Sequence, residues 1–146
     1  MNHRVAVLHG VNLDTLGRRD PAVYGTLTLA ELEGQVGRFA REFGFEASFF
    51  QTNHEGEYCE QLHRAAERSD AVVLNPGAWA HYSYAIRDAL EILDVPIVEV
   101  HLSNVDEREE WRRRSVIADV VTERIAGYGA EGYRMALELI AGKVPA

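Results

Sequence analysis

Short apolar runs alternate with longer amphipathic segments along the chain, and this alternation restricts the fold more than any other feature of the sequence. The apolar runs have the length of buried strands, and the segments between them repeat apolar residues at helical spacing. The predicted strands cover 4–10, 46–51, 71–77, 96–103 and part of 120–129, and the predicted helices cover 28–45, 56–69, 83–94 and 130–142. Strands that alternate with helices favour right-handed crossovers and a parallel sheet covered on both faces. The sequence therefore predicts an α/β fold with one domain over residues 1–146.

Two of the predicted helices carry specific local signals. Thr28 followed by Glu31 forms a capping box, which marks the start of the helix over 28–45. The helix over 83–94 has an apolar face suited to packing on the sheet, made of Ala85, Ile86, Ala89, Leu90 and Leu93. Arg87 and Asp88 fall off that face, where a solvated surface pair is the ordinary interpretation.

Charge and cysteine content exclude several classes of protein. The net charge of −8 argues against binding to nucleic acid or to an anionic membrane through the general field, so any anion site must be local. The single cysteine, Cys59, excludes an internal disulfide and fits a reducing cytoplasm. The sequence has no apolar run of membrane-spanning length, and Met1 leads directly into a strand-like run without a signal peptide.

Polar and ionisable residues gather after the predicted strands. The segments that follow them are HGVNLDTLGRRDPAVYGT, QTNHEGE, NPGAWAHYS and HLSN, whereas the connections at the other end are plain turns. In a parallel sheet of this kind, ligands bind in the crevice beyond the carboxyl ends of the strands. This asymmetry predicts a functional site at that end.

The first of these segments is long for a strand-to-helix connection and has the character of a lid. It contains Arg19 and Tyr24, and a guanidinium beside a tyrosine stabilises the phenolate that a tyrosine base requires. Two structural interpretations remain open at this point. Arg19 could instead be a solvated loop residue. Tyr24 could instead be a packing residue that pins the loop.

A second pair of residues lies at the tip of the fourth predicted strand. Glu99 and His101 are two residues apart and therefore point to the same face of the strand. A carboxylate beside an imidazole fixes its tautomer and favours the imidazolium that a general acid needs. His81 follows the third strand at the same end of the sheet. Each histidine alone could be a half-buried structural residue, but their gathering at one end favours chemistry.

Other kinds of site are disfavoured by the residues present. A zinc site at His81 and His101, joined by His54 or Glu55, lacks a close-spaced ligand pair on a helix. No P-loop, dinucleotide fingerprint or serine nucleophile elbow is found. The single lysine, Lys143, lies in the C-terminal tail, which disfavours Schiff-base chemistry.

These blocks together resemble the type II 3-dehydroquinate dehydratase family. The resemblance covers nearly the whole chain, in the blocks HGVNLDTLGRRDPAVYG, QTNHEGE, LNPGAWAHYSYAIRDAL, VEVHLSN, REEWRRRS and GYGAEGY. It implies a flavodoxin-like three-layer sandwich with a central parallel sheet. It also implies a hydro-lyase that converts 3-dehydroquinate to 3-dehydroshikimate through an enolate, without cofactor or metal. The pathway would be the shikimate route to aromatic amino acids or quinate breakdown, in the cytoplasm.

The resemblance assigns roles to individual residues. Tyr24 matches the base, Arg19 its activator, His101 the general acid with Glu99 behind it, and Asn12 the residue that holds a water against the enolate. The matching substrate contacts are Asn75, His81, Arg112 and the backbone at Leu102 and Ser103. Asp88 matches a residue that reaches the site of a neighbouring subunit, in trimers that form a homododecamer.

Some positions depart from the family pattern, and two alternative functions follow. The family usually begins its first block with Asn-Gly-Pro-Asn, whereas here His9 and Val11 replace the asparagine and the proline. Trp79 and Tyr82 replace smaller or hydroxylated neighbours of His81. These changes leave open a related lyase that acts on another hydroxylated cyclic keto acid. A non-catalytic ligand-binding homologue is the second alternative, disfavoured because the predicted base and acid are both present.

Overall fold

The computed structural model describes residues 3–145 and contains one five-stranded parallel sheet. The strands are β1 His3–His9, β2 Phe45–Gln51, β3 Ala71–Asn75, β4 Ile97–His101 and β5 Glu123–Ala126. Their order in the sheet is β2-β1-β3-β4-β5, and every neighbouring pair is parallel. This is the order of the flavodoxin-like fold, so the predicted fold class is confirmed.

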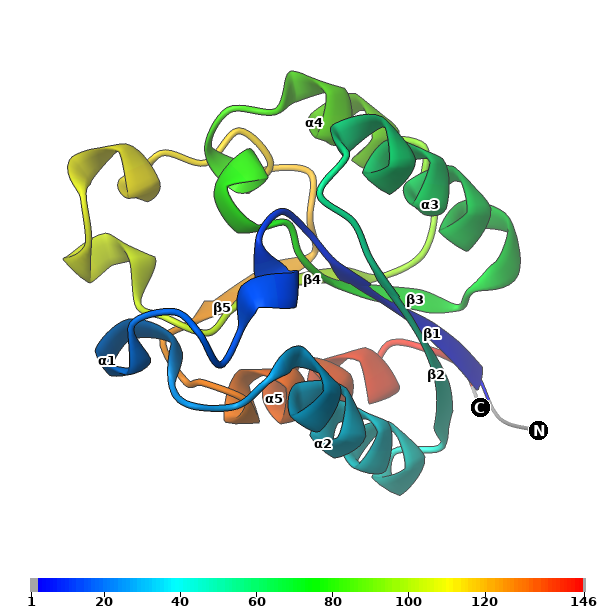
Figure 1. Cartoon of the computed structure of the whole chain (residues 1–146). Coiled ribbons are helices and arrows are strands. Elements are labelled where there is room, and N and C mark those ends of the chain that lie inside the picture. The colour runs from blue at the N-terminus through cyan, green and yellow to red at the C-terminus, as the bar shows by residue number, and fades with distance from the viewer. Residues whose placement is uncertain (1–2, 146) are drawn as a thin grey trace.

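Helices cover both faces of the sheet and give the molecule three layers (Figure 1). On one face lie α2 Leu29–Glu42 and α5 Glu131–Ala141, and on the other lie α3 Glu55–Arg68 and α4 Tyr84–Leu90. A short additional helix, α1 Pro21–Tyr24, stands apart from these layers at one end of the molecule (Figure 1). No helix in residues 3–145 is both long and apolar enough to cross a membrane.

The core is built from strands that are apolar on both faces, as a parallel sheet between two helical layers requires. All five residues of β3 are buried, and so are all five of β4. Leu32 and Leu137 pack on one face of the sheet. Leu62 and Ile86 pack on the other face, and all four side chains are fully buried. Burying a side chain of this size contributes about 1.5–3 kcal/mol.

The predicted capping box is present at the start of α2. Thr28 accepts a hydrogen bond from the backbone of Glu31, and the Glu31 carboxylate accepts one from the backbone of Thr28. The Glu31 carboxylate also accepts a hydrogen bond from the Thr28 hydroxyl, and the two bonds that it accepts lower its pKa because they stabilise the ionised form. This cap fixes the point at which the long first loop rejoins the helical layer.

The third predicted helix is shorter than expected. It was expected over 83–94, but α4 ends at Leu90, and the chain turns before Pro96. A residue that precedes proline is disfavoured in a helix, so the segment cannot remain helical up to the next strand. Ile86, Ala89 and Leu90 pack on the sheet as predicted, whereas Ala85 is exposed. Ala85 lies about 100° around the helix from Ile86, which turns it away from the sheet.

The expected surface pair on α4 also differs from the expectation. Arg87 does not pair with Asp88; its guanidinium donates to both carboxylate oxygens of Asp119 and to the backbone oxygen of Val116. Arg87 therefore fastens the segment before β5 to α4. Asp88 is exposed.

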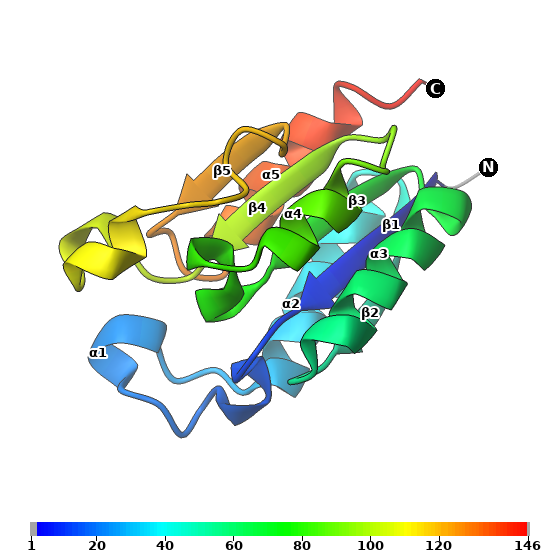
Figure 2. The ribbon, with the colours of Figure 1, turned by 90° about the horizontal axis from the view of Figure 1, so that it is seen from above.

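The carboxyl ends of the strands all lie at the end of the molecule that carries α1 (Figure 2). The loops that follow β1 and β3 touch there, and the contact has room only for glycine. A Cβ at Gly10 would lie 2.4 Å from the backbone oxygen of Pro76. A Cβ at Gly77, whose φ is +63°, would lie 2.8 Å from the backbone oxygen of Val11. This close approach holds the two loops together at the carboxyl ends of the strands.

Candidate active site

A cavity of about 260 Å³ opens at the carboxyl ends of the strands. Its walls come from the loops after β1, β3 and β4. The predicted residues that line it are Asn12, Arg19, Tyr24, Asn75, His81, His101, Leu102, Ser103 and Arg112. Glu99 lies on β4 beneath the cavity, and Asp88 is exposed on α4.

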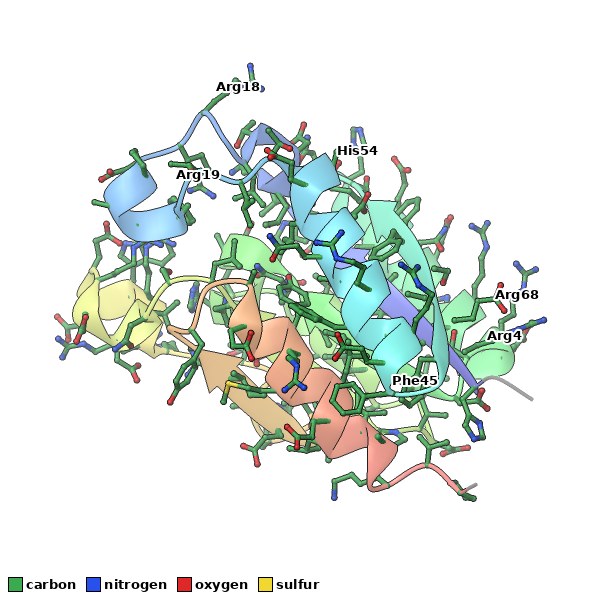
Figure 3. The ribbon with its side chains drawn as sticks, turned by 90° about the horizontal axis from the view of Figure 1, so that it is seen from below. Arg4, Arg18, Arg19, Phe45, His54 and Arg68 are labelled. Atoms are coloured by element: carbon green, nitrogen blue, oxygen red, sulfur yellow. The ribbon has the colours of Figure 1, made fainter. Side chains whose placement is uncertain are left out.

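Arg19 and Tyr24 are held together by the short helix α1. Asp20 caps this helix by accepting a hydrogen bond from the backbone of Ala22, and Pro21 occupies its first position. The Nη2 of Arg19 donates to the Tyr24 hydroxyl at 2.7 Å, and the guanidinium carbon lies 3.8 Å from the ring centroid. Arg19 therefore places a positive charge directly beside the Tyr24 oxygen. Arg18, the neighbour of Arg19, instead extends from the outer edge of the loop (Figure 3).

A second arginine reaches Tyr24, and the sequence did not predict it. The guanidinium carbon of Arg108 lies 5.0 Å from the Tyr24 ring centroid. Its Nη1 lies 3.4 Å from the hydroxyl oxygen of Ser103. Arg108 therefore bridges the lid and the loop after β4. Arg108 lies in a charged segment of short turns without a regular period, so the sequence does not indicate where its side chain points.

His101 and Glu99 form the pair that their spacing predicts. The Nε2 of His101 is hydrogen-bonded to the carboxylate of Glu99, and Glu99 is fully buried. Because Nε2 faces the carboxylate, Nδ1 is the ring nitrogen that remains for a group in the cavity. The pair has the geometry of an imidazole held in one orientation by a carboxylate behind it.

His81 faces the cavity as a neutral imidazole. Burial lowers its pKa, with smaller contributions from the positive charges of His101, Arg112 and Arg124; the bond to the Arg114 carbonyl opposes the shift. The Nδ1 of His81 donates to that carbonyl oxygen at 2.6 Å, which leaves Nε2 as a hydrogen-bond acceptor. A neutral ring with a free acceptor suits the hydroxyl group of a ligand.

The lowered pKa of His81 predicts a pH-dependent stability. The unfolded chain binds a proton at this residue more readily than the folded chain does, so stability should fall as the pH drops from 7.5 to 5.5. One group contributes a slope of at most about 1.4 kcal/mol per pH unit. Thermal unfolding of H81Q should show a shallower pH dependence than the wild type. The exposed residue His63 provides the control, because H63Q should keep the wild-type slope; equal slopes in the wild type and H81Q would refute the assignment.

Two asparagines line the cavity, Asn12 from the loop after β1 and Asn75 from the end of β3. Asn12 has a φ of +68° and is the one non-glycine residue in 3–145 with a positive φ. Asparagine tolerates this left-handed conformation better than most residues. The backbone N–H of Asn12 donates to the side-chain oxygen of Asn53 at 2.7 Å. The side-chain amide of Asn12 takes no part in this contact. The side-chain oxygen of Asn75 accepts from the backbone N–H of Gly77 at 3.1 Å, which fixes the orientation of this amide beside the cavity.

The far wall of the cavity is cationic and aromatic. The guanidinium of Arg112 pairs with Glu109 and lies 4.1 Å from the ring centroid of Trp111. The Trp111 ring meets the His81 ring edge-on at 5.4 Å between centroids. Trp111 therefore ties Arg112 to His81, a contact that the sequence did not predict. Together with the backbone after β4, Arg112 makes this wall suitable for a carboxylate.

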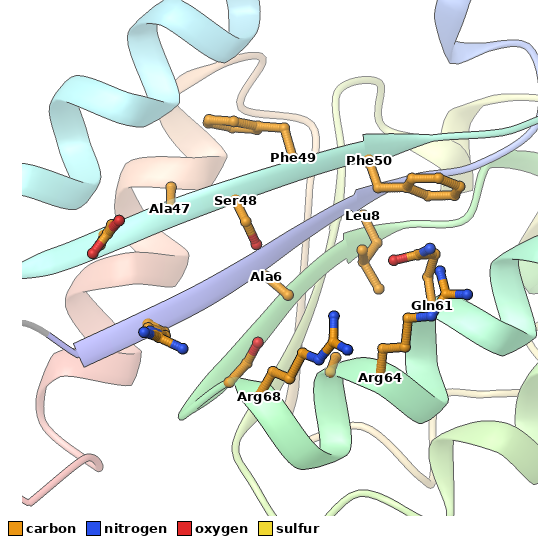
Figure 4. Close-up of a pocket in the computed structure, with 13 residues that line it drawn as sticks. Ala6, Leu8, Ala47, Ser48, Phe49, Phe50, Gln61, Arg64 and Arg68 are labelled. Carbon is orange, nitrogen blue, oxygen red and sulfur yellow. The ribbon is translucent and has the colours of Figure 1, made fainter.

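A metal or a second site has less support in the geometry. Across residues 3–145, no three His, Cys, Asp or Glu side chains come close enough to share a metal ion. A larger hollow of about 410 Å³ lies between β2 and α3, and its rim carries Arg64 and Arg68 (Figure 4). Histidine and tyrosine are absent from its lining, and its one carboxylate, Glu46, is exposed and has no imidazole or phenol beside it there. The cavity at the strand ends brings Tyr24, His81 and His101 together, and it is the candidate active site.

The substituted positions near the site have structural roles. His9 is fully buried at the end of β1, its Nε2 lies 3.1 Å from the Glu33 carboxylate on α2, and its ring stacks on Phe49. Trp79 is buried and packs edge-on against Tyr58 at 5.4 Å. These side chains point into the protein and away from the cavity lining. His9 and Trp79 therefore change the support beneath the site, whereas Val11 lines the cavity and Tyr82 is exposed.

Sequence comparison identifies close relatives across nearly the whole chain. The family model described as Dehydroquinase class II matches residues 3–141. A protein of Syntrophotalea carbinolica named 3-dehydroquinate dehydratase is 54% identical over 92% of this chain and 91% of its own length. The protein of the same name from Bacillus licheniformis is 52% identical over 91% of this chain and 92% of its own.

Solved structures agree with the sequence comparison. The type II dehydroquinase of Propionibacterium acnes superposes with a TM-score of 0.93 at 44% identity, and covers 97% of this chain and 98% of its own. A 3-dehydroquinate dehydratase-like protein of Bifidobacterium longum gives a TM-score of 0.72 at 32% identity over 97% of both chains. On the match of residues 3–141 and on these likenesses in sequence and structure, the chain belongs to the class II dehydroquinase family.

Proposed function

We propose that this chain is a hydro-lyase that removes water from 3-dehydroquinate and forms 3-dehydroshikimate. The relatives named 3-dehydroquinate dehydratase support this substrate. The observation that carries the proposal is one cavity lined by both Tyr24, bonded to Arg19, and His101, backed by Glu99. A base and an acid on one cavity are what a stepwise elimination of water requires.

The first step is removal of the proton next to the ketone. Tyr24 takes this proton as a phenolate, and the electron pair moves onto the carbonyl oxygen to give an enolate. Arg19 stabilises the phenolate before the transfer, and Arg108 adds positive charge near the same ring. Asn12 holds a water molecule against the enolate oxygen, where negative charge develops. The conformation of Asn12, with its amide free beside the cavity, supports this role.

The second step is loss of the hydroxyl group. The enolate electrons re-form the ketone, a carbon–carbon double bond forms in conjugation with it, and the carbon–oxygen bond to the hydroxyl group breaks. The imidazolium of His101 gives its proton to that oxygen, so water leaves. Tyr24 is then protonated and His101 is neutral, and one proton must pass back before the next turnover. Glu99 stabilises the imidazolium before the transfer.

The remaining groups hold the substrate. The substrate carboxylate lies against the backbone N–H groups of Leu102 and Ser103, with Arg112 nearby. The hydroxyl groups of the ring are bound by the free acceptor of His81 and by the Asn75 amide. The burial of Asn75, His81 and Ser103 beside the cavity supports this arrangement, because fixed polar groups orient a small substrate. The proposal needs no metal and no cofactor.

The direct test is the appearance of the conjugated product. Purified protein mixed with 3-dehydroquinate should give a rising ultraviolet absorbance from the new enone, and the rate should scale with enzyme concentration. Absence of turnover at high enzyme concentration would contradict the proposal. It would favour the alternative of a related lyase for another hydroxylated cyclic keto acid.

We also propose that the active unit is a trimer within a homododecamer, acting in the cytoplasm in the shikimate route to aromatic amino acids. In this arrangement Asp88 reaches the site of a neighbouring subunit. The exposure of Asp88 on α4 supports this, because its own chain leaves it free to contact another.

Replacement of Asp88 by alanine tests the shared site. D88A should lower the assembled mass in light scattering and reduce kcat/KM by about tenfold or more, because one truncated charged contact at an interface costs about 1.4 kcal/mol or more. Asp94, an exposed carboxylate in the turn after the same helix, gives the control variant D94A. A fully assembled and fully active D88A would show Asp88 to be an ordinary surface residue.

A further inference from the structure

The carboxylate of Glu99 is a charged group buried inside the sheet layer of this fold. It is fully buried, and one of its oxygens, Oε2, faces the Nε2 of His101. Within residues 3–145, the other oxygen, Oε1, is buried without a hydrogen-bond partner. A buried carboxylate is costly unless positive charge compensates it. The imidazole of His101 supplies that charge only while it is protonated.

Arg124 on β5 provides a permanent positive charge at the same carboxylate. Glu99 and Arg124 are direct partners in the register of β4 and β5, so their side chains stand on the same face of the sheet. The Nε of Arg124 lies 3.7 Å from the Oε2 of Glu99. Among the described residues, this Nε is buried and has no hydrogen-bond partner, while a quarter of the side chain is exposed. The guanidinium keeps its charge at every relevant pH.

Other charged and titratable groups near the pair do not bond Glu99. His81 lies on the cavity side, with its ring centroid 6.3 Å from that of His101, and Arg112 belongs to the same wall. Tyr58 on α3 is close enough to Glu99 for the carboxylate to add to the rise in its pKa, which burial mainly causes. Its hydroxyl donates to the Leu8 backbone at 3.0 Å. In the part of the chain described, His101 and Arg124 are thus the two cationic partners of this carboxylate.

We infer that Arg124 is a positioning residue for the reaction, which holds and neutralises the Glu99 carboxylate when His101 has given up its proton. The inference rests on the proposed role of His101 as the acid. When the imidazolium transfers its proton to the departing hydroxyl, Glu99 loses one of its two cationic partners. Arg124 remains in place, so the carboxylate is never left buried and unpaired. The array Arg124–Glu99–His101 therefore lowers the electrostatic cost of releasing the proton.

The first test replaces Arg124 by methionine, which keeps an unbranched stem and removes the charge. R124M should lower kcat by about tenfold, a fraction of the hundredfold to ten-thousandfold effect typical of a general acid. KM should stay within about twofold, because Arg124 is not among the residues that line the cavity. R124K should recover part of kcat, since it keeps a charge but has a different shape.

A double-mutant cycle separates this role from a general effect on folding. In the variant E99Q the charge that Arg124 compensates is absent, so adding R124M to E99Q should change kcat by less than about twofold. The control is R134M, which removes an arginine whose Nε lies 3.6 Å from the exposed carboxylate of Glu42. R134M should keep the wild-type kcat. Equal losses from R124M in the wild-type and E99Q backgrounds would overturn the inference.

Thermal unfolding provides a measurement that does not depend on activity. Without substrate, R124M should lower the midpoint more in the wild-type background than in the E99Q background, because only the former leaves a buried carboxylate with one partner fewer. Additive changes in the midpoint would overturn the inference, whatever the kinetics. Non-additive midpoints in a wild-type protein that does not dehydrate 3-dehydroquinate would support the Arg124–Glu99 coupling and refute the proposed function.

Discussion

Replacement of Tyr24 by phenylalanine is expected to lower kcat by about a hundredfold to ten-thousandfold, the range over which a general base acts. The ring keeps its packing and its contact with the Arg19 guanidinium, whose carbon lies 3.8 Å from the ring centroid. The oxygen that accepts the 2.7 Å hydrogen bond from Arg19 is lost, and no other group on α1 can take its place. KM should change little, because the phenolate acts on the transition state more than on the bound substrate.

Steady-state assays on 3-dehydroquinate measure both constants for Y24F. The matched control is Y128F, which removes the hydroxyl of an exposed tyrosine outside the cavity lining and should leave kcat unchanged. Exchange of the substrate proton next to the ketone with deuterated water provides an independent measurement, since Y24F should abolish it. Wild-type kcat in Y24F would exclude Tyr24 as the base.

The parallel sheet, and the position of the candidate site at one end of it, could be predicted because their signals are local in the sequence. The apolar runs and the helical repeats predicted all five strands and the four helices of the outer layers, and the parallel direction of the strands then places the polar loops at one end. The pairing of Glu99 with His101 follows from a spacing of two on one strand. The contact of Arg19 with Tyr24 was a prediction from chemistry, and the short helix α1 provides its geometry.

Contacts between different elements could not be predicted in this way. Arg124 meets Glu99 because of the register of β4 with β5, which depends on how the strands pair in space. Arg108 reaches Tyr24 from a segment of short turns, and neither partner carries a periodic signal for the other. The role of Asp88 followed from the resemblance alone, because it depends on where a second chain lies. The missing information was in each case the relative placement of two segments.

Replacement of His101 by alanine should also lower kcat by about a hundredfold or more, because the departing hydroxyl would leave without a proton. The loss should be larger than that of E99Q, in which the amide still orients the ring but no longer carries the charge that favours imidazolium. His101 lines the cavity and is only 5% exposed. Its removal would also leave space beside the neighbouring His81 ring, whose centroid lies 6.3 Å from that of His101.

The comparison of H101A with E99Q distinguishes chemistry from packing. Glu99 is fully buried and does not line the cavity, so a purely structural pair would lose stability when either member changed, with small and equal effects on kcat. An acid and its orienting carboxylate should instead give unequal losses in kcat. H63A, at an exposed position on α3, controls for the loss of an imidazole. Equal and small reductions in H101A and E99Q would reduce both residues to structural roles and would remove the acid from the proposed mechanism.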